Sequence, residues 1–253
     1  MTSVLVERAG EILVVTLNRP ERRNAVTREV SERVASAMDE LDSDPALRCA
    51  IITGSGGHFC SGMDLKVFAS GERPEVDGRG FAGVTEAPPA KPLIAAVEGF
   101  ALAGGFELAL ACDLIVASET AQFGLPEPTR GLVAGSGGLV RLARRIPPNI
   151  AMEYGLTGAR MDARTAQRLG LVNRLVAAGK ALGSALDLAR ILAANAPLSV
   201  ATSKRIMVEQ AGWPAERLWD IQRPLVDAVV QSRDAQEGAR AFADKRQPVW
   251  EGR

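Results

Sequence analysis

Short, uninterrupted apolar runs that end at glycine constrain the fold of this chain more than any other feature. The runs Cys49–Thr53 and Leu93–Val97 are each followed within two residues by a glycine. Such runs are typical of strands buried on both faces of a helix-covered sheet. Before the first run, apolar residues recur at helical spacing from an N-cap at Thr27 to a breaker at Asp44–Pro45. Strand and helix patterns therefore alternate, which predicts a mixed α/β fold.

The remaining patterns divide the chain into a mixed part and a helical tail. Residues 4–8 and 12–18 predict a β-hairpin. A helix is expected from Gly104 to about Cys112, with a strand at 114–117. Residues 69–92 are rich in Gly, Pro and charge, so we expect a surface loop or short helix, long enough to act as a lid. After Gly135 we expect helices at 139–145, 150–156, 163–169, 182–195, 199–210, 215–232 and 235–246.

Composition excludes several classes of function. The 253 residues contain 30 Lys and Arg against 30 Asp and Glu, and 4% are aromatic, so no basic, aromatic-bearing surface for nucleic acid is expected. A single histidine, His58, leaves no plausible Ser-His-Asp triad and is expected to be structural or exposed. No glycine-rich nucleotide-binding motif is complete. Three cysteines without zinc-knuckle spacing predict reduced thiols and no metal site.

Two stretches of the sequence bear on location. Residues 1–10 lack the basic and apolar regions of a signal peptide. The longest apolar stretch, Leu93–Val116, contains three acidic residues, which argues against a membrane span. We therefore expect a soluble, cytoplasmic protein without a membrane partner.

Glu107 is the first candidate for chemistry. If the chain is helical from Gly104, the neighbours of Glu107 on the same helix face are apolar or glycine. A carboxylate in apolar surroundings tends to have a raised pKa, which suits general acid or base catalysis near neutral pH. The alternative is an exposed charge on an otherwise buried helix.

Glu127 is the second candidate, and it lies between Pro126 and Pro128. Pro128 should push Glu127 out of the helical region, so the covalent frame would set the direction of its side chain. A surface turn carboxylate is the alternative interpretation. The two acids are 20 residues apart with a strand between them, so they could converge on one site.

Two glycine-containing turns could supply backbone donors. Phe59–Asp64 follows one predicted strand, and Ala101–Gly105 follows another and opens a helix. Free N–H groups at a helix start can hold an oxyanion, and two such groups make an oxyanion hole. Each turn alone is a weak signal, since paired glycines before a helix often serve only close packing.

Taken together, these segments resemble one known family. Ile94–Ala109, Cys112–Asp113 and Phe123–Glu127 are similar to the signature of the enoyl-CoA hydratase/isomerase (crotonase) superfamily. Segments with further counterparts are 18–20, 24–25, 59–65, 156–158, 170–173 and 241–246, so the resemblance covers essentially the whole chain. Leu125–Gly131 and the ending 245–253 look more like the carnitinyl-CoA dehydratase branch than like the fatty-acid hydratases.

The resemblance implies an architecture and a set of partners. Residues 1–195 would form an α/β, crotonase-like spiral of β-β-α turns that carries the CoA and acyl site. Residues 196–253 would form a C-terminal helical trimerisation region, giving a homotrimer or a hexamer of two trimers. The substrate would be an acyl-CoA thioester, with no cofactor, because coenzyme A is part of the substrate.

The resemblance also assigns roles to individual positions. Glu107 and Glu127 would hold a water between them; one would activate it for attack at C3, and the other, usually the position of Glu127, would exchange the proton at C2. The amides of Met63 and Gly104 match the oxyanion hole. Further positions that match substrate-binding residues are Ala25, Ser61, Asp64, Leu65 and Gly105, with Phe242 and Lys245 touching CoA from a neighbouring subunit.

The implied function is reversible syn hydration of a 2-enoyl-CoA. Dehydration of a substituted hydroxyacyl-CoA such as carnitinyl-CoA, or double-bond isomerisation, is the alternative within the family. An isomerase would need only the role of Glu127. A non-catalytic acyl-CoA-binding protein is a further alternative, expected to have lost one or both acids, and this chain retains both. The segment 66–92 has no pattern that identifies the acyl group.

Overall fold

A six-stranded sheet forms the base of the molecule in this computed structural model, which describes residues 2–253. A hairpin opens the sheet, with β1 antiparallel to β2, and every later neighbour in the sheet is parallel. In spatial order the strands are β1 (Val4–Ala9), β2 (Ile12–Leu17), β3 (Cys49–Gly54), β6 (Leu93–Val97), β8 (Leu114–Ser118) and β11 (Arg174–Val176). The predicted hairpin and both predicted buried strands are confirmed.

Two smaller sheets complete the β structure. One has the order β10 (Arg160–Asp162), β9 (Gln122–Gly124) and β7 (Phe100–Leu102), and β7 and β9 run parallel. The other pairs β4 (Glu75–Val76) with β5 (Gly80–Phe81). These short strands, and β11, were absent from the sequence-based prediction, because two or three residues show no measurable periodicity.

Helices cover both faces of the main sheet. The helix α1 (Arg28–Ser43) begins at the predicted N-cap, where Thr27 accepts a hydrogen bond from Val30 N. On one face, α7 (Ala181–Ala193) packs its alanines at four-residue spacing against outward-facing residues of β2, β3, β6 and β8. The other helices are α2 (Leu65–Ala69), α3 (Gly104–Ala111), α4 (Gly138–Arg145), α5 (Pro148–Thr157), α6 (Ala163–Arg168), α8 (Pro197–Glu209), α9 (Leu218–Val230) and α10 (Arg233–Ala243).

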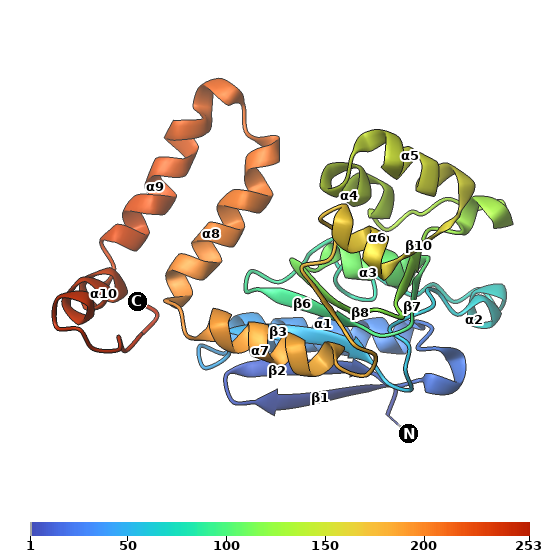
Figure 1. Ribbon diagram of the computed structural model, residues 1–253, viewed down its shortest axis with the longest axis horizontal. Helices are drawn as coiled ribbons and strands as arrows, with labels where there is room; N and C mark the ends of the chain where they lie inside the picture. Colours follow the sequence, from blue (N-terminus) through green and yellow to red (C-terminus); the bar gives the residue numbers. More distant parts are fainter. Residues whose placement is uncertain (1) are drawn as a thin grey trace.

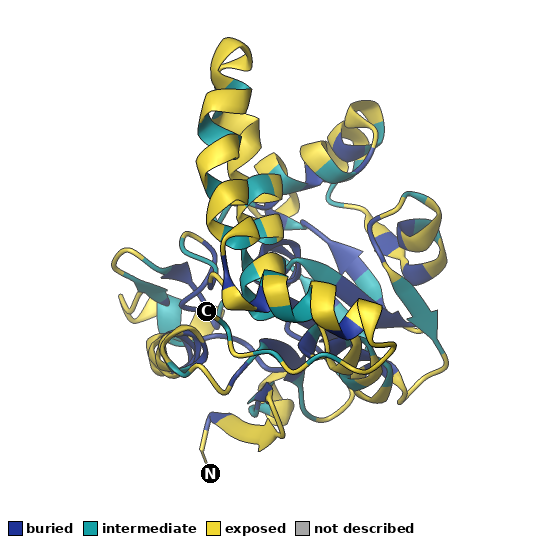
Figure 2. Ribbon diagram, turned by 90° about the vertical axis from the view of Figure 1, so that its left-hand side faces the viewer, coloured by how far each residue is buried: buried dark blue, intermediate teal, exposed yellow. Residues whose placement is uncertain are grey.

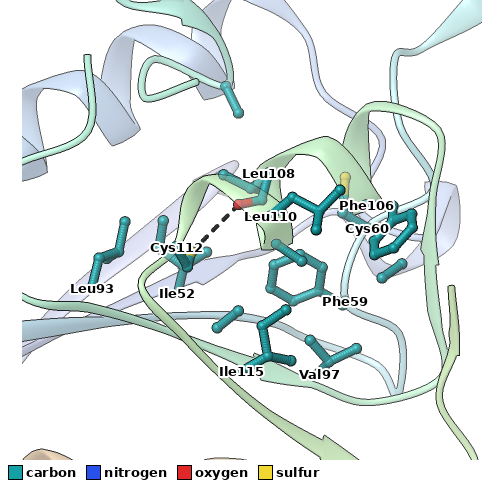
Figure 3. Close-up of a cluster of buried hydrophobic side chains, with 14 of the residues drawn as sticks. Ile52, Phe59, Cys60, Leu93, Val97, Phe106, Leu108, Leu110, Cys112 and Ile115 are labelled. Carbon is teal, nitrogen blue, oxygen red and sulfur yellow. Dashed lines mark hydrogen bonds between the residues drawn. The ribbon is translucent and has the colours of Figure 1, made fainter. Parts of the chain in front are cut away.

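The main core lies on the opposite face of the sheet from α7. Helix α3 is buried along its whole length, and its Leu108 and Leu110 belong to the same buried cluster as Phe59 and Ile115 (Figure 3). Cys49, Cys60 and Cys112 are buried and free, and burial raises the pKa of each thiol to about 12. A buried α3 is what places the start of that helix, and Glu107 within it, inside the protein.

The C-terminal helices extend away from this body. Figure 1 shows α8 and α9 as an antiparallel pair that projects from the sheet, with α10 and the C-terminus beyond them. No residue of α8 or α9 is buried, and Figure 2 shows the pair largely exposed. The tail returns to the body, because Trp250 Nε1 donates to the carbonyl of Ala194 at 2.8 Å. The predicted helix at 215–232 is interrupted: a 3-10 turn at Ala215–Arg217 precedes α9.

The segment 69–92 is a correction to the sequence-based expectation. It contains the hairpin β4–β5 rather than a surface loop or a helix, and Phe81, Ala82, Val84 and Thr85 are buried. Gly83 lies so close to the Ser31 carbonyl of α1 that a side chain there would collide with it. The second half of the segment is therefore part of the packed interior, and it cannot open as a lid without breaking these contacts.

Candidate active site

Three parallel segments end side by side at the candidate site. Strand β7 pairs with β9, with Leu102 opposite Gly124. On the other side of β7, Cys60 bridges Ala101 in parallel, with Cys60 N bonded to Phe100 O at 2.9 Å. The carboxyl ends of such neighbours lie at one edge, where ligands bind in many parallel α/β proteins. The chain leaving these ends carries Met63, Gly104 with Glu107, and Glu127.

Backbone amides anchor Glu107. Its Oε1 accepts hydrogen bonds from Ser136 N at 2.7 Å and from Gly138 N at 2.9 Å, and the residue is 3% exposed. A side chain at Gly138 would come within 2.6 Å of Glu107 Cγ, so glycine is required for this approach. Burial raises the pKa of Glu107, and the hydrogen bonds from Gly138 and Ser136 and the charge of Arg141 partly oppose that rise. The buried interpretation is therefore correct, and the exposed alternative is wrong.

Glu127 is buried but much less well satisfied. It is 8% exposed, and its Oε2 makes no hydrogen bond within residues 2–253. Burial raises the pKa of Glu127; the charge of Glu107 raises it further, while its own N–H and Arg130 oppose the rise. The surface-turn alternative is wrong. The expected effect of Pro128 is also wrong, because Glu127 opens a 3-10 turn, Glu127–Arg130, in which proline fits the first positions.

Two backbone N–H groups lie on adjoining turns at this edge. The bridge from Val26 uses Gly62 O and Asp64 N, so the Met63 N–H between them points the other way. Gly104 begins α3, and its N–H has no helical acceptor. A methyl group at Gly62 would lie 3.1 Å from Gly104 N, which places the two turns in contact. Met63 and Gly104 thus lie on adjoining turns, the two turns that the sequence suggested as sources of backbone donors.

The backbone of Ala103, just before α3, is strained. Ala103 has φ +52° and ψ −131°, a conformation that L-residues with a side chain rarely adopt. Its N–H donates to Gly124 O at 2.9 Å, and its carbonyl accepts from Phe106 N and Glu107 N. The strained residue sets the direction in which α3 leaves β7, and with it the direction of the Gly104 N–H.

Sequence reasoning missed Phe81, which packs on this turn. Its side chain is 3% exposed, and a methyl group at Gly104 would lie 2.5 Å from Phe81 Cζ. The aromatic ring therefore lies against Gly104 beside the candidate oxyanion hole. Nothing local in the 69–92 segment indicates this contact, because it joins residues 23 positions apart through β5.

Two of the predicted CoA-path residues, Ala25 and Asp64, are bonded to Arg19, which the sequence did not single out. Its Nη1 donates to Ala25 O at 2.6 Å and its Nη2 to Asp64 Oδ2 at 3.0 Å. Burial raises the pKa of Asp64, but the hydrogen bond and charge of Arg19 outweigh burial, so the pKa is lowered. Ser61 N bonds to Arg23 O at 3.0 Å. Leu65, the first residue of α2, is 51% exposed.

The other three predicted substrate-binding positions lie in two different places. Gly105 is buried and packs against the Cys60 carbonyl, so its lack of a side chain holds two turns of the site together. Phe242, 89% exposed, and Lys245, exposed, lie at the end of α10. Figure 1 shows α10 at the opposite end of the molecule from α2. Within one chain these two residues are therefore not part of the site.

Metal binding, membrane crossing and the role of His58 can be considered together. Within residues 2–253, no group of three or more His, Cys, Asp and Glu side chains is arranged to hold a metal ion. In the same range, no helix combines the length and the apolar character needed to cross a bilayer. His58 has structural contacts: its Nδ1 accepts from Phe100 N at 3.2 Å, and its ring stacks on Phe100 with centroids 4.7 Å apart.

Comparison with known proteins agrees with this geometry. The family model described as enoyl-CoA hydratase/isomerase matches residues 7–253. This chain belongs to the enoyl-CoA hydratase/isomerase family. The mixed α/β fold with a largely parallel sheet is accordingly the crotonase fold, as the sequence resemblance predicted.

Named relatives in the family include both dehydratases and hydratases. The chain is 46% identical over 259 aligned positions to a carnitinyl-CoA dehydratase from Salmonella enteritidis, covering 99% of each protein. An enoyl-CoA hydratase structure from Mycobacterium tuberculosis is 55% identical, with full coverage of both chains and a TM-score of 0.98. A carnitinyl-CoA hydratase structure from Mycobacterium avium is 44% identical, with full coverage and a TM-score of 0.81. The family and these relatives indicate a lyase of the hydratase or dehydratase type.

Proposed function

We propose that this protein is an enoyl-CoA hydratase that adds water reversibly and with syn geometry across the C2–C3 bond of a 2-enoyl-CoA. The observation that carries the proposal is a pair of buried glutamates, Glu107 and Glu127, in the segments that follow two adjacent parallel strands. The family supports an acyl-CoA thioester as the substrate class. In this proposal, no cofactor is needed, because coenzyme A belongs to the substrate.

The different surroundings of the two acids support different roles. Two amide hydrogen bonds favour the ionised form of Glu107, which makes it the better candidate to accept a proton from water. Glu127 has an unpartnered oxygen and the charge of Glu107 beside it, both of which favour its protonated form. In hydration, Glu107 would take a proton as the water oxygen bonds to C3, and Glu127 would give its proton to C2. The reverse steps would release water.

The amides of Met63 and Gly104 would hold the thioester oxygen. As water attacks C3, electrons move through the double bond to that oxygen, which becomes an enolate. Backbone donors aimed at it stabilise the developing charge, and losing one donor from such a site typically costs about 10²- to 10³-fold in rate. Because only the N–H is used, the Met63 side chain is free to shape the acyl pocket.

Dehydration of a carnitinyl-CoA-like substrate is the second candidate. The full-length similarity to a carnitinyl-CoA dehydratase favours it, and its chemistry is the same pathway in reverse with a polar group on C4. Isomerisation and acyl-CoA binding without turnover are the other candidates. An isomerase would need only one acid, whereas both acids here are buried at the site.

The deciding experiment follows loss of the enoyl-thioester absorbance with crotonyl-CoA and a longer enoyl-CoA, and its gain with carnitinyl-CoA. Wild type, Glu107→Gln and Glu127→Gln are compared. For a hydratase, both substitutions lower turnover by about 10²- to 10⁴-fold. An isomerase would keep its activity in Glu107→Gln. Tight CoA-ester binding with no product from any substrate would contradict the enzyme proposal.

We propose further that the chain assembles as a homotrimer, or as a hexamer of two trimers. The α8–α9 pair exposes large apolar side chains that a monomer would leave in water: Met207, Val208, Trp219, Val226 and Val230. Sedimentation equilibrium tests this directly. A stable monomer at micromolar concentration would contradict it.

A further inference from the structure

Arg141 joins two segments that approach the site from different directions. It lies on α4, and its Nη2 donates to the carbonyl of Thr85 at 2.6 Å, while its Nη1 donates to the carbonyl of Ser136 at 3.3 Å. The planar guanidinium presents several N–H donors in a rigid fork, so one side chain can hold two carbonyls in fixed relative positions. Arg144, three residues further along α4, is exposed and makes no comparable hydrogen bond within residues 2–253.

The Ser136 carbonyl belongs to the loop that anchors Glu107. Ser136 is held from both sides: its N–H donates to Glu107 Oε1 at 2.7 Å, and its carbonyl accepts from Arg141. Gly137, next in the chain, packs directly on the guanidinium: a side chain there would come within 2.3 Å of Arg141 Nη1, and the guanidinium would have to shift. Gly138 N supplies the second bond to Glu107 Oε1. The loop thus lies between the guanidinium and the carboxylate, and its position fixes the anchored oxygen.

The Thr85 carbonyl belongs to the segment that carries Phe81. Thr85 is 2% exposed and closes the turn after β5, where its N–H donates to Phe81 O at 3.2 Å. The Phe81 ring lies against Gly104, one helical turn before Glu107. Arg141 therefore connects the residue beside the candidate oxyanion hole with the loop behind the candidate base.

We propose that Arg141 is a positioning residue, which holds the Glu107 carboxylate and the Phe81 segment in register through the carbonyls of Ser136 and Thr85. The kinetic consequences of this proposal rest on the proposed function. Its structural consequences rest on these contacts alone. Without the fork, the Ser136 loop and the Phe81 segment move independently, and Glu107 loses part of its fixed direction.

The charge of Arg141 gives this role a distinct signature. The charged groups that face Glu107 are Arg141 from α4 and Glu127 from the turn after β9, with Arg130 acting on Glu127. Removing the positive charge raises the pKa of Glu107, so activity that needs its carboxylate falls off at a higher pH. A merely structural arginine would lower the amount of folded protein and leave the pH profile unchanged.

The experiment compares wild type with Arg141→Gln, Arg141→Lys and the control Arg144→Gln. Amide hydrogen exchange without substrate is read in peptides that cover residues 132–140 and 79–88. In Arg141→Gln, exchange becomes about tenfold faster in both peptides, whereas Arg144→Gln matches wild type. Unchanged exchange in a folded Arg141→Gln overturns the proposal. If Arg141→Gln does not fold, Arg141→Lys is read in its place, with faster exchange expected in both peptides and wild-type exchange overturning the proposal.

The kinetic arm uses enoyl-CoA hydration as a function of pH. We expect Arg141→Gln to lower kcat about tenfold or more, with little change in KM, and to move the acid limb to higher pH. Arg141→Lys keeps the charge and restores the acid limb without restoring the full rate. A wild-type acid limb in Arg141→Gln overturns the proposal. If wild type itself turns over no acyl-CoA, the proposed function fails, and hydrogen exchange alone decides the role of Arg141.

Discussion

Glu107 and Glu127 follow the carboxyl ends of two hydrogen-bonded parallel strands, and Glu107 accepts hydrogen bonds from two backbone amides of a distant loop. Glu107 Oε1 accepts two N–H bonds, whereas Glu127 Oε2 accepts none within residues 2–253. The same strand pair thus delivers two carboxyl groups to one place with different electrostatic surroundings. Two acids with different surroundings are suited to act together as an acid and a base.

Replacing Glu127 by Gln should stabilise the protein at high pH. Burial raises the pKa of Glu127 above its unfolded value of about 4.3. The folded state therefore binds the proton more tightly, and stability falls as pH rises from that value through the folded pKa. We expect the free energy of unfolding of Glu127→Gln to be about 1 kcal/mol higher than that of wild type at pH 8. The difference should disappear near pH 4.

Urea unfolding at several pH values measures this effect. Glu153→Gln, an exposed substitution on α5, is the matched control and should follow wild type throughout. A constant difference across the pH range would show that the gain, if any, does not come from the charge of Glu127.

Gly104→Ala should destabilise the protein through Phe81. The added methyl group would lie 2.5 Å from Phe81 Cζ, so the buried ring must move. Overpacking of this kind costs about 1–3 kcal/mol. Phe81→Ala should relieve the clash, giving a clear coupling between the two sites in a double-mutant cycle measured by urea unfolding. Gly183→Ala on α7, where nothing lies within 4 Å of the new methyl group, should not destabilise.

Asp64→Asn should weaken the fold near neutral pH and not in acid. Arg19 lowers the pKa of Asp64 despite its burial, so the ion pair contributes in full above the unfolded pKa of about 3.9. That contribution is lost as pH falls through the lower folded pKa. We expect a loss of about 2 kcal/mol at pH 7 that shrinks below pH 4. The exposed pair Arg28–Glu32 offers the control Glu32→Gln, which should change stability by less than about 0.5 kcal/mol.

Lys245→Glu should weaken CoA-ester binding because Lys245 of one subunit would contact the CoA bound to its neighbour. Lys245 follows α10, which Figure 1 shows at the opposite end of the molecule from α2, so the contact with CoA that the resemblance implies would be made across subunits. We expect calorimetric Kd for a CoA ester to rise about tenfold with the oligomeric state unchanged. Lys180→Glu, also exposed, is the control. Wild-type affinity in Lys245→Glu would contradict the cross-subunit role.

The sequence by itself determined the elements whose information is local. The apolar runs at β3 and β6 and the capped helix α1 were recognisable because burial and capping act on neighbouring residues. Local patterns also singled out Glu107 and Glu127, and the family signature added the crotonase fold. Strands as short as β7 and β9 carry no periodic pattern, although their parallel pairing is what brings the two acids together.

Only the tertiary structure decided the surroundings of the acids. The donors to Glu107 come from residues 29 and 31 positions away, and Arg141 reaches 56 positions back to Thr85. Contacts of this kind depend on how whole elements pack. The residue types in each segment do not by themselves indicate which distant residue will be the partner. Residue types therefore identify which groups could react, whereas packing sets which oxygen is anchored, which is left without a partner and how far each pKa moves.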